Sequence, residues 1–578
     1  MIRTFVAAML LASSALAQTA PSNADQRLKA IYDAEWQWRM AQTGQVQDGL
    51  EAKPGDRLPC VTPACQEARR RHWQDVLDQM ATIPDADLSP EERLNKAVLS
   101  ESLRAEVTGI GWRNFEMPIT SDSNFWSYLP GRAPFLTVAE YRRYISRMRD
   151  VPRYFDEQMA NMRAGMKRGF TPPAITLKGR DETLAAQIKP VDESPFFAPF
   201  KQMPSQAITA AEQDALRAEA RQVIDTIVNP AQQRVLTFLR TQYVSGARTT
   251  TAAAALPNGL PWYRDQVREF TTLDMTPESI HQLGLKEVAR IEADMQKTMR
   301  DAGFKGSFKE FLTFLRTDPQ FYAKTPNELL GFSALVMKKM DGKLDQVFTT
   351  LPRYRFTLRP VAPAIAPVYT SGRGGLDACY MNTYDLPSRP LYNLVALTLH
   401  ECVPGHSHQA AMALEAPERP AFRRRTYFSG YGEGWGLYTE WLGTKLGMYE
   451  TPYEEFGRET FEMWRAARLV IDTGLHTMGW SRDQAIAYLE DHTALSRRDI
   501  EVEVDRYISW PGQALAYKLG ELKIRELRAK AEVELGARFD QRPFHDTLLG
   551  MGSVPLPVME AEMLRWLEVE KAKVSLAK

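Results

Sequence analysis

Residues 276–303 read TPESIHQLGLKEVARIEADMQKTMRDAG and carry the signals of a long helix. Thr276 can cap the N-terminus, and Pro277 suits the first helical position. Apolar side chains recur at helical spacing from Ile280 to Ile291, and Gly303 can close the last turn. We therefore predict a helix from Thr276 to about Gly303.

The same periodicity extends over much of the remaining chain, in residues 25–40, 90–107, 138–169, 209–243, 455–476 and 520–536. Strand-like patterns are scarce and occur at 353–360 and 377–383, just before a histidine cluster. We predict a mainly α, large two-lobed helical fold with a small β-sheet near that cluster. The mature chain divides into an N-terminal helical region, 18–350, and a catalytic region, 351–578, which we expect to form one intertwined unit.

Composition excludes several classes of protein. Hydrophobic residues make up 44% and charged residues 25% of the chain, as in ordinary soluble globular proteins. The 72 Lys and Arg residues balance the 72 Asp and Glu residues, so no overall basic field exists to attract nucleic acid. We expect no nucleic-acid partner, and the sequence leaves the oligomeric state open.

The N-terminus has the form of a signal peptide in residues 1–17. Arg3 supplies a positive charge, residues 5–11 are apolar, and Ala15-Leu16-Ala17 resembles a cleavage site. This apolar run is too short to span a membrane, and no later uncharged stretch reaches the necessary length. We predict an exported protein, periplasmic or secreted, without a membrane span in its mature chain.

Only four cysteines are present. Cys60 and Cys65 bracket a short turn and could form a disulfide in an oxidising compartment. For Cys379 and Cys402 the default expectation is that each is a small buried hydrophobic side chain.

Three of the eight histidines occur within nine residues, in the segment LHECVPGHSHQ at 399–409. Zinc proteases of the His-Glu-x-x-His type hold two imidazoles one helical turn apart, but here Pro404 occupies that second position. On an unbroken helix, His406 would lie about 120° from His400 around the axis. A kink or bulge at Pro404 and Gly405 could return the His406 ring to the face of His400.

A third metal ligand is expected from the segment YGEGWGLYTE at 431–440. Glu433 lies between two glycines, which permit close approach of the backbone, and Glu440 lies two turns further along nearly the same face. We predict that Glu433 is the ligand and that Glu440 orients a ligand histidine. The alternative for Glu440 is a solvated helix carboxylate.

Four blocks of sequence together resemble the bacterial "domain of unknown function 885" family, which is assigned to the thermolysin-like zinc peptidase superfamily. The blocks are HECVPGH at 400–406 with Gln409, GEGW at 432–435, DTGLH at 472–476 with GW at 479–480, and RYISWPGQA at 506–514 with YKLG at 517–520. The family usually has a second histidine directly after Pro-Gly-His. Here Ser407 stands at that position and His408 follows, so the role of His408 is open.

The resemblance implies a metallopeptidase-like fold that binds one Zn²⁺ per chain through His400, His406 and Glu433. The fourth position would be open for water, Glu401 would act as general base, and the substrate would be a peptide. Candidates to stabilise the oxyanion are His476, Tyr507 and Tyr517, for each of which a structural role in the core is the alternative.

Two further elements are candidates for substrate binding. Arg506 could hold a peptide carboxylate or form a structural salt bridge. Residues 378–383, which include Tyr380 and Asn382, are expected to be the edge strand of the cleft, pairing with an extended substrate. The alternative is a buried strand without a free edge.

Three other functions compete with peptide hydrolysis. A zinc hydrolase of non-peptide amides or esters would use the same chemistry. A non-catalytic exported binding protein would have a degenerate site, and a structural zinc site would be closed by His408 as fourth ligand. A pure binding protein has no use for a base such as Glu401 beside two ligand histidines, which favours an enzyme.

Overall fold

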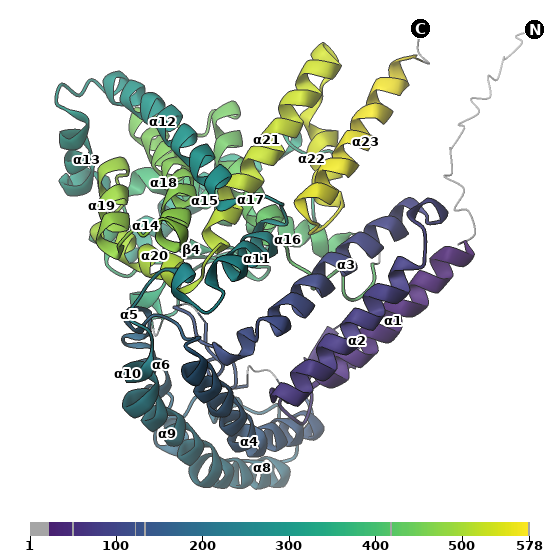
Figure 1. Ribbon diagram of the computed structural model, residues 1–578. Helices are drawn as coiled ribbons and strands as arrows, with labels where there is room; N and C mark the ends of the chain where they lie inside the picture. The colour runs from purple at the N-terminus through teal and green to yellow at the C-terminus, as the bar shows by residue number, and fades with distance from the viewer. Residues whose placement is uncertain are drawn as a thin grey trace, which may run out of the picture.

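A computed structural model describes residues 22–48, 51–121, 123–131, 135–363, 365–416 and 419–575. The expected signal peptide, residues 1–17, lies outside these ranges. Helices predominate (Figure 1), which confirms the prediction of a mainly α fold. The helix expected at 276–303 is α12 (Pro277–Asp301): the Thr276 side chain accepts a hydrogen bond from the Ser279 N–H, and Gly303 follows the last turn with φ +74°.

Three N-terminal helices lie side by side along one flank of the molecule (Figure 1). A short antiparallel hairpin connects the first two. The Tyr32 ring packs 5.4 Å from that of Phe422, measured between centroids, so this layer is joined to the main core. The elements are α1 (Asn23–Gln42), β1 (Gln45–Asp48), β2 (Glu51–Pro54), α2 (Pro63–Ala81) and α3 (Pro90–Gly111).

The lobe drawn lowest in Figure 1 has two small cores of its own, one around Trp126 and Phe155 and the other around Tyr144 and Phe200. The helical run expected at 209–243 is present, with π-helical turns at Ile224–Val228 and Leu239–Tyr243. The helices are α4 (Val138–Arg168), α5 (Ala174–Leu177), α6 (Arg180–Ala185), α7 (Ala198–Lys201), α8 (Ala210–Val223), α9 (Asn229–Phe238) and α10 (Val244–Gly246).

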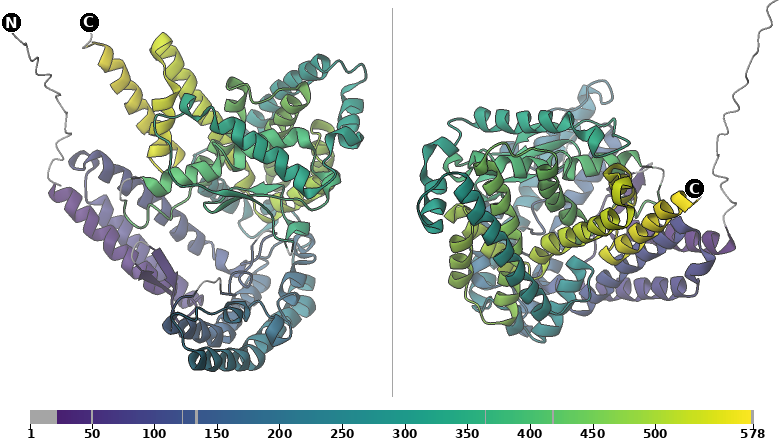
Figure 2. Two further views of the ribbon diagram at one scale, coloured as in Figure 1. Left: turned by 180° about the vertical axis from the view of Figure 1, so that it is seen from behind. Right: turned by 90° about the horizontal axis from the view of Figure 1, so that it is seen from above.

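The larger lobe contains most of the remaining described residues, and the left view in Figure 2 shows it above the smaller one. Its strands are β3 (Thr357–Pro360), β4 (Gly372–Arg373) and β5 (Ala378–Met381). Its other helices are α11 (Gly259–Thr271), α13 (Phe308–Thr317), α14 (Pro326–Asp341), α15 (Leu394–Glu401), α16 (His406–Glu415), α17 (Ser429–Lys445), α18 (Pro452–Thr477), α19 (Arg482–His492), α20 (Arg497–Ser509), α21 (Ala516–Leu535), α22 (Gln541–Gly550) and α23 (Leu556–Ser575).

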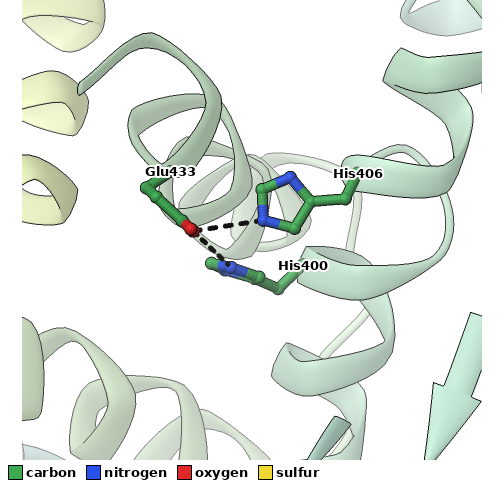
Figure 3. A group of neighbouring side chains, drawn as sticks. All are labelled: His400, His406 and Glu433. Atoms are coloured by element: carbon green, nitrogen blue, oxygen red, sulfur yellow. Dashed lines mark hydrogen bonds and ion pairs between the residues drawn. The ribbon is translucent and has the colours of Figure 1, made fainter. Parts of the chain in front are cut away.

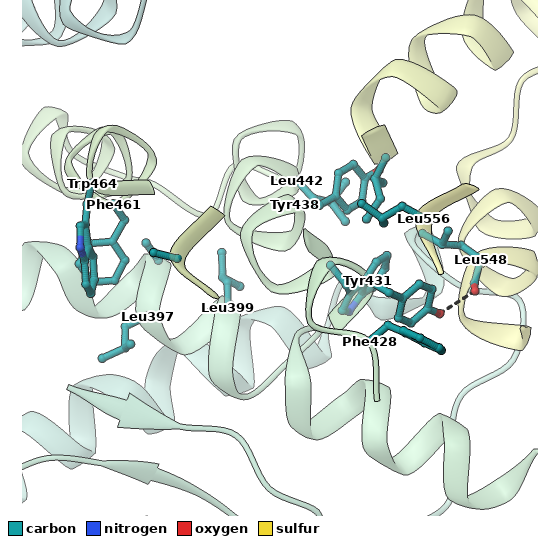
Figure 4. Close-up of a cluster of buried hydrophobic side chains, with 14 of the residues drawn as sticks. Leu397, Leu399, Phe428, Tyr431, Tyr438, Leu442, Phe461, Trp464, Leu548 and Leu556 are labelled. Atoms are coloured by element: carbon teal, nitrogen blue, oxygen red, sulfur yellow. Dashed lines mark hydrogen bonds between the residues drawn. The ribbon is translucent and has the colours of Figure 1, made fainter. Parts of the chain in front are cut away.

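The main hydrophobic core includes residues from both sides of position 350. Helix α12 packs closely along α18, where a Cβ atom at Gly284 would come within 2.8 Å of Leu469 Cβ. Figure 4 shows a part of this core, with Leu399 of α15 and Tyr431 of α17 in one cluster. Each fully buried leucine of this kind contributes roughly 2 kcal/mol to stability.

The small sheet has the order β3-β5-β4, so the strand at 378–381 lies in the middle. The prediction that this strand forms the edge of the cleft is therefore wrong. The outer strand is β4, which pairs antiparallel with β5 through Gly372 and Arg373. A disulfide joins Cys379 of β5 to Cys402 at the end of α15, which corrects the expectation of two separate buried thiols.

Cys60 and Cys65 form a second disulfide, as the sequence suggested. Two disulfides are typical of a protein that folds outside the reducing cytoplasm, so the chain is an exported protein. In the part of the chain that the structure describes, no helix is both long and apolar enough to cross a bilayer.

Candidate metal centre

The histidine motif begins at the end of the buried helix α15, where His400 and Glu401 are the last two residues. The chain then leaves the helix and includes a cis peptide bond between Val403 and Pro404. A new helix, α16, starts at His406. The kink or bulge expected at Pro404 is thus a complete break between two helices, and it brings the His406 ring within 4.8 Å of the His400 ring, centroid to centroid.

Two contacts hold this break in place. Gly405 lies against the carbonyl groups of Leu399 and His400, where any side chain would overlap the backbone. The indole N–H of Trp435 donates a hydrogen bond of 3.0 Å to the Pro404 carbonyl. The glycine-rich helix α17 therefore anchors the break directly.

Helix α17 also supplies Glu433, whose Oε2 lies 3.2 Å from His406 Nε2 and 3.6 Å from His400 Nε2. Figure 3 shows the three side chains pointing toward one another, and their ligand atoms lie within 4.8 Å of each other. Gly436 allows this approach, because a Cβ atom there would be 2.7 Å from Cε1 of His400. Among the described residues, no other group of three such side chains offers a comparable metal site.

Glu440 lies behind His400. Its Oε1 is 2.7 Å from His400 Nδ1, which leaves Nε2 facing Glu433 and His406. The same Glu440 oxygen is 3.4 Å from Nη2 of Arg465. The structure thus brings Glu440 to the position expected of a group that orients a ligand histidine, and it is buried rather than solvated.

The electrostatics of the cluster suit a cation. Burial would lower the pKa of His400, but its hydrogen bonds to Glu433 and Glu440 outweigh burial and raise the pKa to about 9. Burial also opposes ionisation of Glu433, yet the His406 and His400 rings hold its pKa well below the usual value. Two imidazoles and one carboxylate that together stabilise positive charge fit the three-ligand set of a catalytic zinc site.

Glu401 follows His400 and is fixed by the loop after β4. Its Oε2 accepts a 2.5 Å hydrogen bond from the Gly374 N–H, and Ser407 Oγ accepts one of 3.0 Å from the Gly375 N–H. A Cβ atom at Gly374 would overlap His406 and the Glu401 carbonyl, so only glycine permits this approach. Ser407, the residue that departs from the family pattern, therefore attaches the loop after β4 to the histidine motif through this hydrogen bond.

The three candidate ligands and Glu401 line a cavity of about 660 Å³. Its wall also includes Arg465 and Arg468 of α18, Arg506 of α20 and Tyr517 of α21. A second cavity of about 740 Å³ adjoins it and shares Glu433, Arg506 and residues 425–427 with the first. Glu433 thus lies where the two cavities adjoin, whereas His400, Glu401 and His406 line only the first.

Two of the predicted oxyanion groups do not line this cavity. His476 is fully buried: its Nδ1 accepts the Ala253 N–H at 3.1 Å, and its Nε2 donates to the Tyr507 carbonyl at 3.0 Å. Burial lowers its pKa to about 3, so the ring is neutral. Tyr507 is also buried, and its hydroxyl accepts hydrogen bonds from Trp464 and Arg468. Both residues support the wall of the cleft instead of facing it.

Asn382 and Tyr380, which were proposed for substrate binding, and His408, whose role was open, all have structural contacts. Asn382 is buried and donates to the carbonyl groups of 366, 369 and 370. Tyr380 lies on the central strand and donates its hydroxyl hydrogen to Asp377. His408 stacks on Phe348 with ring centroids 4.8 Å apart, and burial lowers its pKa to about 4. His408 is not part of the ligand cluster, so the alternative of a structural zinc site closed by His408 is not supported.

Sequence reasoning missed Arg465, Arg468, Tyr427 and the loop at 372–374, all of which line the cavity. The two arginines lie one turn apart in α18, and only the structure shows that the residues of this helix from 456 to 475 are all buried. A charged side chain in such a helix requires a partner or a function. Tyr427 lies in an irregular segment whose position depends on the fold, so the sequence carried no signal for it either.

Comparisons with known proteins agree on the fold. Residues 43–563 match the family described as bacterial protein of unknown function (DUF885), whereas no curated protein matches. The crystal structure of a "putative lipoprotein" from Colwellia psychrerythraea is similar with a TM-score of 0.84 and 28% identity, and covers 94% of this chain and 100% of that one. A "putative lipoprotein of unknown function" from Shewanella oneidensis has a TM-score of 0.69 and 18% identity over the same shares of the two chains. Since the family match extends over most of the sequence, the chain belongs to the DUF885 family of bacterial proteins.

Proposed function

We propose that this protein is a zinc-dependent peptidase that hydrolyses short peptides in its main cavity. The observation that carries the proposal is the convergence of His400, His406 and Glu433, from three successive helices, beside Glu401 on the cavity wall. Two histidines and one glutamate are the ligand set of thermolysin-type zinc sites. When bound, zinc supplies a Lewis acid with one position open for water, whose pKa falls to about 7.

Glu401 is the proposed general base. Its carboxylate is held by the Gly374 N–H and lies on the cavity wall next to the ligand histidines. It would take a proton from the attacking water and pass that proton to the leaving amine. A carboxylate in this position has no role in a site that only binds zinc structurally.

Two tyrosines can stabilise the oxygen that becomes negative during attack. Tyr517 Oη accepts a hydrogen bond of 3.1 Å from Arg506, which polarises the hydroxyl and leaves its hydrogen available. Tyr427 lies against the start of α17, next to Gly432, and therefore close to Glu433. Both line the cavity, as hydrogen-bond donors for an oxyanion must.

The shape of the cleft favours short peptides. The two adjoining cavities, about 660 and 740 Å³, can take an extended chain of several residues but not a folded domain. We place the protein in the periplasm, because it carries two disulfides and because similar solved structures are described as lipoproteins.

The proposal is tested by measuring zinc content and peptide hydrolysis on the mature chain and on two variants. Glu401→Gln should keep about one zinc and lose turnover, because it removes the base and no ligand. His406→Gln should lose both zinc and turnover. Wild-type protein without zinc, or a Glu401→Gln variant that cleaves as fast as wild type, would contradict the proposal. Cleavage of esters or small amides but not peptides would instead identify a non-peptide hydrolase.

A further inference from the structure

The main cavity is strongly basic. Among the described residues, eight arginines line it, whereas the two carboxylates on its wall, Glu401 and Glu433, belong to the candidate metal centre. Cavities lined by one sign of charge concentrate ligands of the opposite sign. The cleft should therefore attract anionic substrates, although the chain as a whole has no net charge.

Several of these arginines already have partners in the fold. Arg419 donates to the Gly550 carbonyl, and Arg423 donates to the Met551 carbonyl and the Asn95 side chain. Their charges contribute to the field of the cavity, and hydrogen bonds to backbone carbonyls fix both side chains, although Nε of Arg423 has no hydrogen-bond partner among the described residues. Arg465 and Arg468 of α18 differ in position, because they contact Glu440 and Tyr517, which both adjoin His400.

Arg468 is only 1% exposed, and its guanidinium is not fully paired. Its Nε donates to Tyr507 Oη at 3.0 Å and its Nη2 to Glu503 at 2.9 Å, while its Nη1 has no hydrogen-bond partner among the described residues. Arg465 is similar: its Nη1 donates to the Phe461 carbonyl at 3.3 Å, and its Nε is unpaired within the described part of the chain. Buried donors on a cation are costly to leave unsatisfied.

Three arginines and His400 share two nearby carboxylates, Glu440 and Glu503. Glu503 lies near two cations, Arg468 at 2.9 Å and Arg506 at 3.6 Å. One oxygen of the Glu440 carboxylate contacts both Arg465 and His400. Burial lowers the pKa of Arg465, and repulsion from Arg468 adds to this effect despite the attraction of Glu440. One further negative charge would thus be stabilised at this wall.

Tyr517 links this wall to the metal centre. Its ring centroid is 6.5 Å from that of His400 and 4.3 Å from Cζ of Arg468. A group bound at Arg468 would therefore lie no more than about three extended residues from the metal ligands. Planar guanidinium groups pair best with carboxylates, which accept two parallel hydrogen bonds.

We propose that Arg468, with Arg465 beside it, forms a subsite for a substrate carboxylate within three residues of the bond that is cut. This inference names the substrate class of the proposed peptidase and rests on that function: peptides with a carboxylate near the scissile bond. The carboxylate is either the C-terminus of a short peptide or an acidic side chain, and both present the same chemistry to the arginines.

The test is a binding experiment that does not depend on turnover. The mature Glu401→Gln protein is stripped of metal with 1,10-phenanthroline, which carries no carboxylate, and dialysed. Calorimetry then compares three acetylated tetrapeptides: tetra-alanine with a free C-terminus, the same peptide as its amide, and an amide whose last residue is aspartate. The measurement is repeated after one equivalent of zinc has been added.

We expect the free acid to bind roughly 10- to 100-fold more tightly than the alanine amide, with and without zinc. If the aspartate amide also binds tightly, side-chain carboxylates are accepted; if it does not, the subsite takes the C-terminus. Equal affinity of the acid and the alanine amide would overturn the proposal. A preference seen only with zinc would also overturn it, because the metal ion would then be the carboxylate site.

Variants separate the subsite from the general field of the cavity. Arg468→Gln should reduce the preference for the acid to about twofold, and Arg468→Lys should reduce it partly, since lysine keeps the charge but loses the planar fork. Arg424→Gln is the matched control, because Arg424 is exposed on the same cavity and should leave the preference intact. If Arg424→Gln abolishes the preference and Arg468→Lys does not change it, the subsite is misassigned.

The inference and the proposed function can fail independently. Binding that prefers the acid, in a protein that cleaves no peptide, would retain the carboxylate subsite and reject the peptidase. Zinc-dependent cleavage of acid and amide peptides at equal rates would retain the peptidase and reject the subsite. If Arg468→Gln does not fold, as judged by circular dichroism, the proposal is still tested by two measurements. These are the affinities of the acid and amide peptides for the protein with Arg468 intact and the same comparison in Arg468→Lys.

Discussion

Replacing Gly436 by alanine should damage the metal centre directly. A Cβ atom at this position of α17 would lie 2.7 Å from Cε1, 2.8 Å from Nε2 and 3.0 Å from Nδ1 of His400. Carbon atoms in contact are normally about 3.5–4.0 Å apart, so the overlap is at least about 0.8 Å. The new methyl group would meet the whole imidazole ring, and the ring or the two helices must move.

Either movement costs free energy. The ring is held by Glu440 at 2.7 Å from Nδ1, and α15 and α17 pack on each other through buried side chains. Overpacking of this kind costs roughly 1–3 kcal/mol of stability. A displaced ligand ring should in addition lower zinc affinity by roughly 10- to 100-fold, as loss of an orienting contact does.

Gly284→Ala provides the matched control. Its Cβ atom would come within 2.8 Å of Leu469 Cβ and of Val470 Cγ2, a similar overlap between a different pair of helices. Urea unfolding of the metal-free proteins measures stability, and competition with a coloured chelator measures zinc affinity. Both variants should lose stability, and only Gly436→Ala should lose zinc affinity beyond about threefold. Wild-type zinc affinity in Gly436→Ala, or equal losses in both variants, would refute the reasoning.

Three other predictions follow from the site and its supports. Tyr517→Phe should lower kcat by about 100-fold with zinc retained, because it removes an oxyanion donor. Tyr507→Phe should instead lower the free energy of unfolding by about 1–3 kcal/mol. Steady-state kinetics and urea unfolding measure the two effects, and equal losses of kcat in both variants would contradict the distinction. Replacing Cys379 and Cys402 by serine opens a loop with a sequence separation of 23 and should cost roughly 3 kcal/mol in urea unfolding, a prediction that fails if the loss is below about 1 kcal/mol. Burial raises the pKa of Asp472 to about 7, so its stabilising contribution is present below pH 4 and is lost as the pH rises to 7; Asp472→Asn should flatten that decline in a pH series of melting curves, and an unchanged slope would contradict it.

The sequence predicted most of the helices because their caps and periodicity are local. Thr276 and Pro277 start α12 where expected, and the interruption at Pro404 occurs where the missing N–H required one. The convergence of His400, His406 and Glu433 was also predictable, because the residue types suit a metal ligand set and the glycines beside Glu433 permit close approach of the backbone.

What could not be predicted depends on contacts between distant segments. Cys379 and Cys402 are bonded because a strand and a helix end meet, which no spacing rule reveals. His476 and Tyr507 lie in blocks with catalytic-looking residues, yet they face the interior and hold segments 253 and 507 together. The arginines that line the main cavity likewise come from positions far apart in the sequence, between 373 and 506, and form no motif.

Diffraction on both sides of the zinc absorption edge, from crystals of the mature protein purified without added metal, tests the central claim most directly. The account predicts one anomalous peak within coordination distance of Nε2 of His400, Nε2 of His406 and the Glu433 carboxylate, with no fourth protein ligand. If these crystals show no peak, they are soaked in zinc and measured again. Absence of a peak after the soak, or a peak elsewhere in the molecule, would contradict the account.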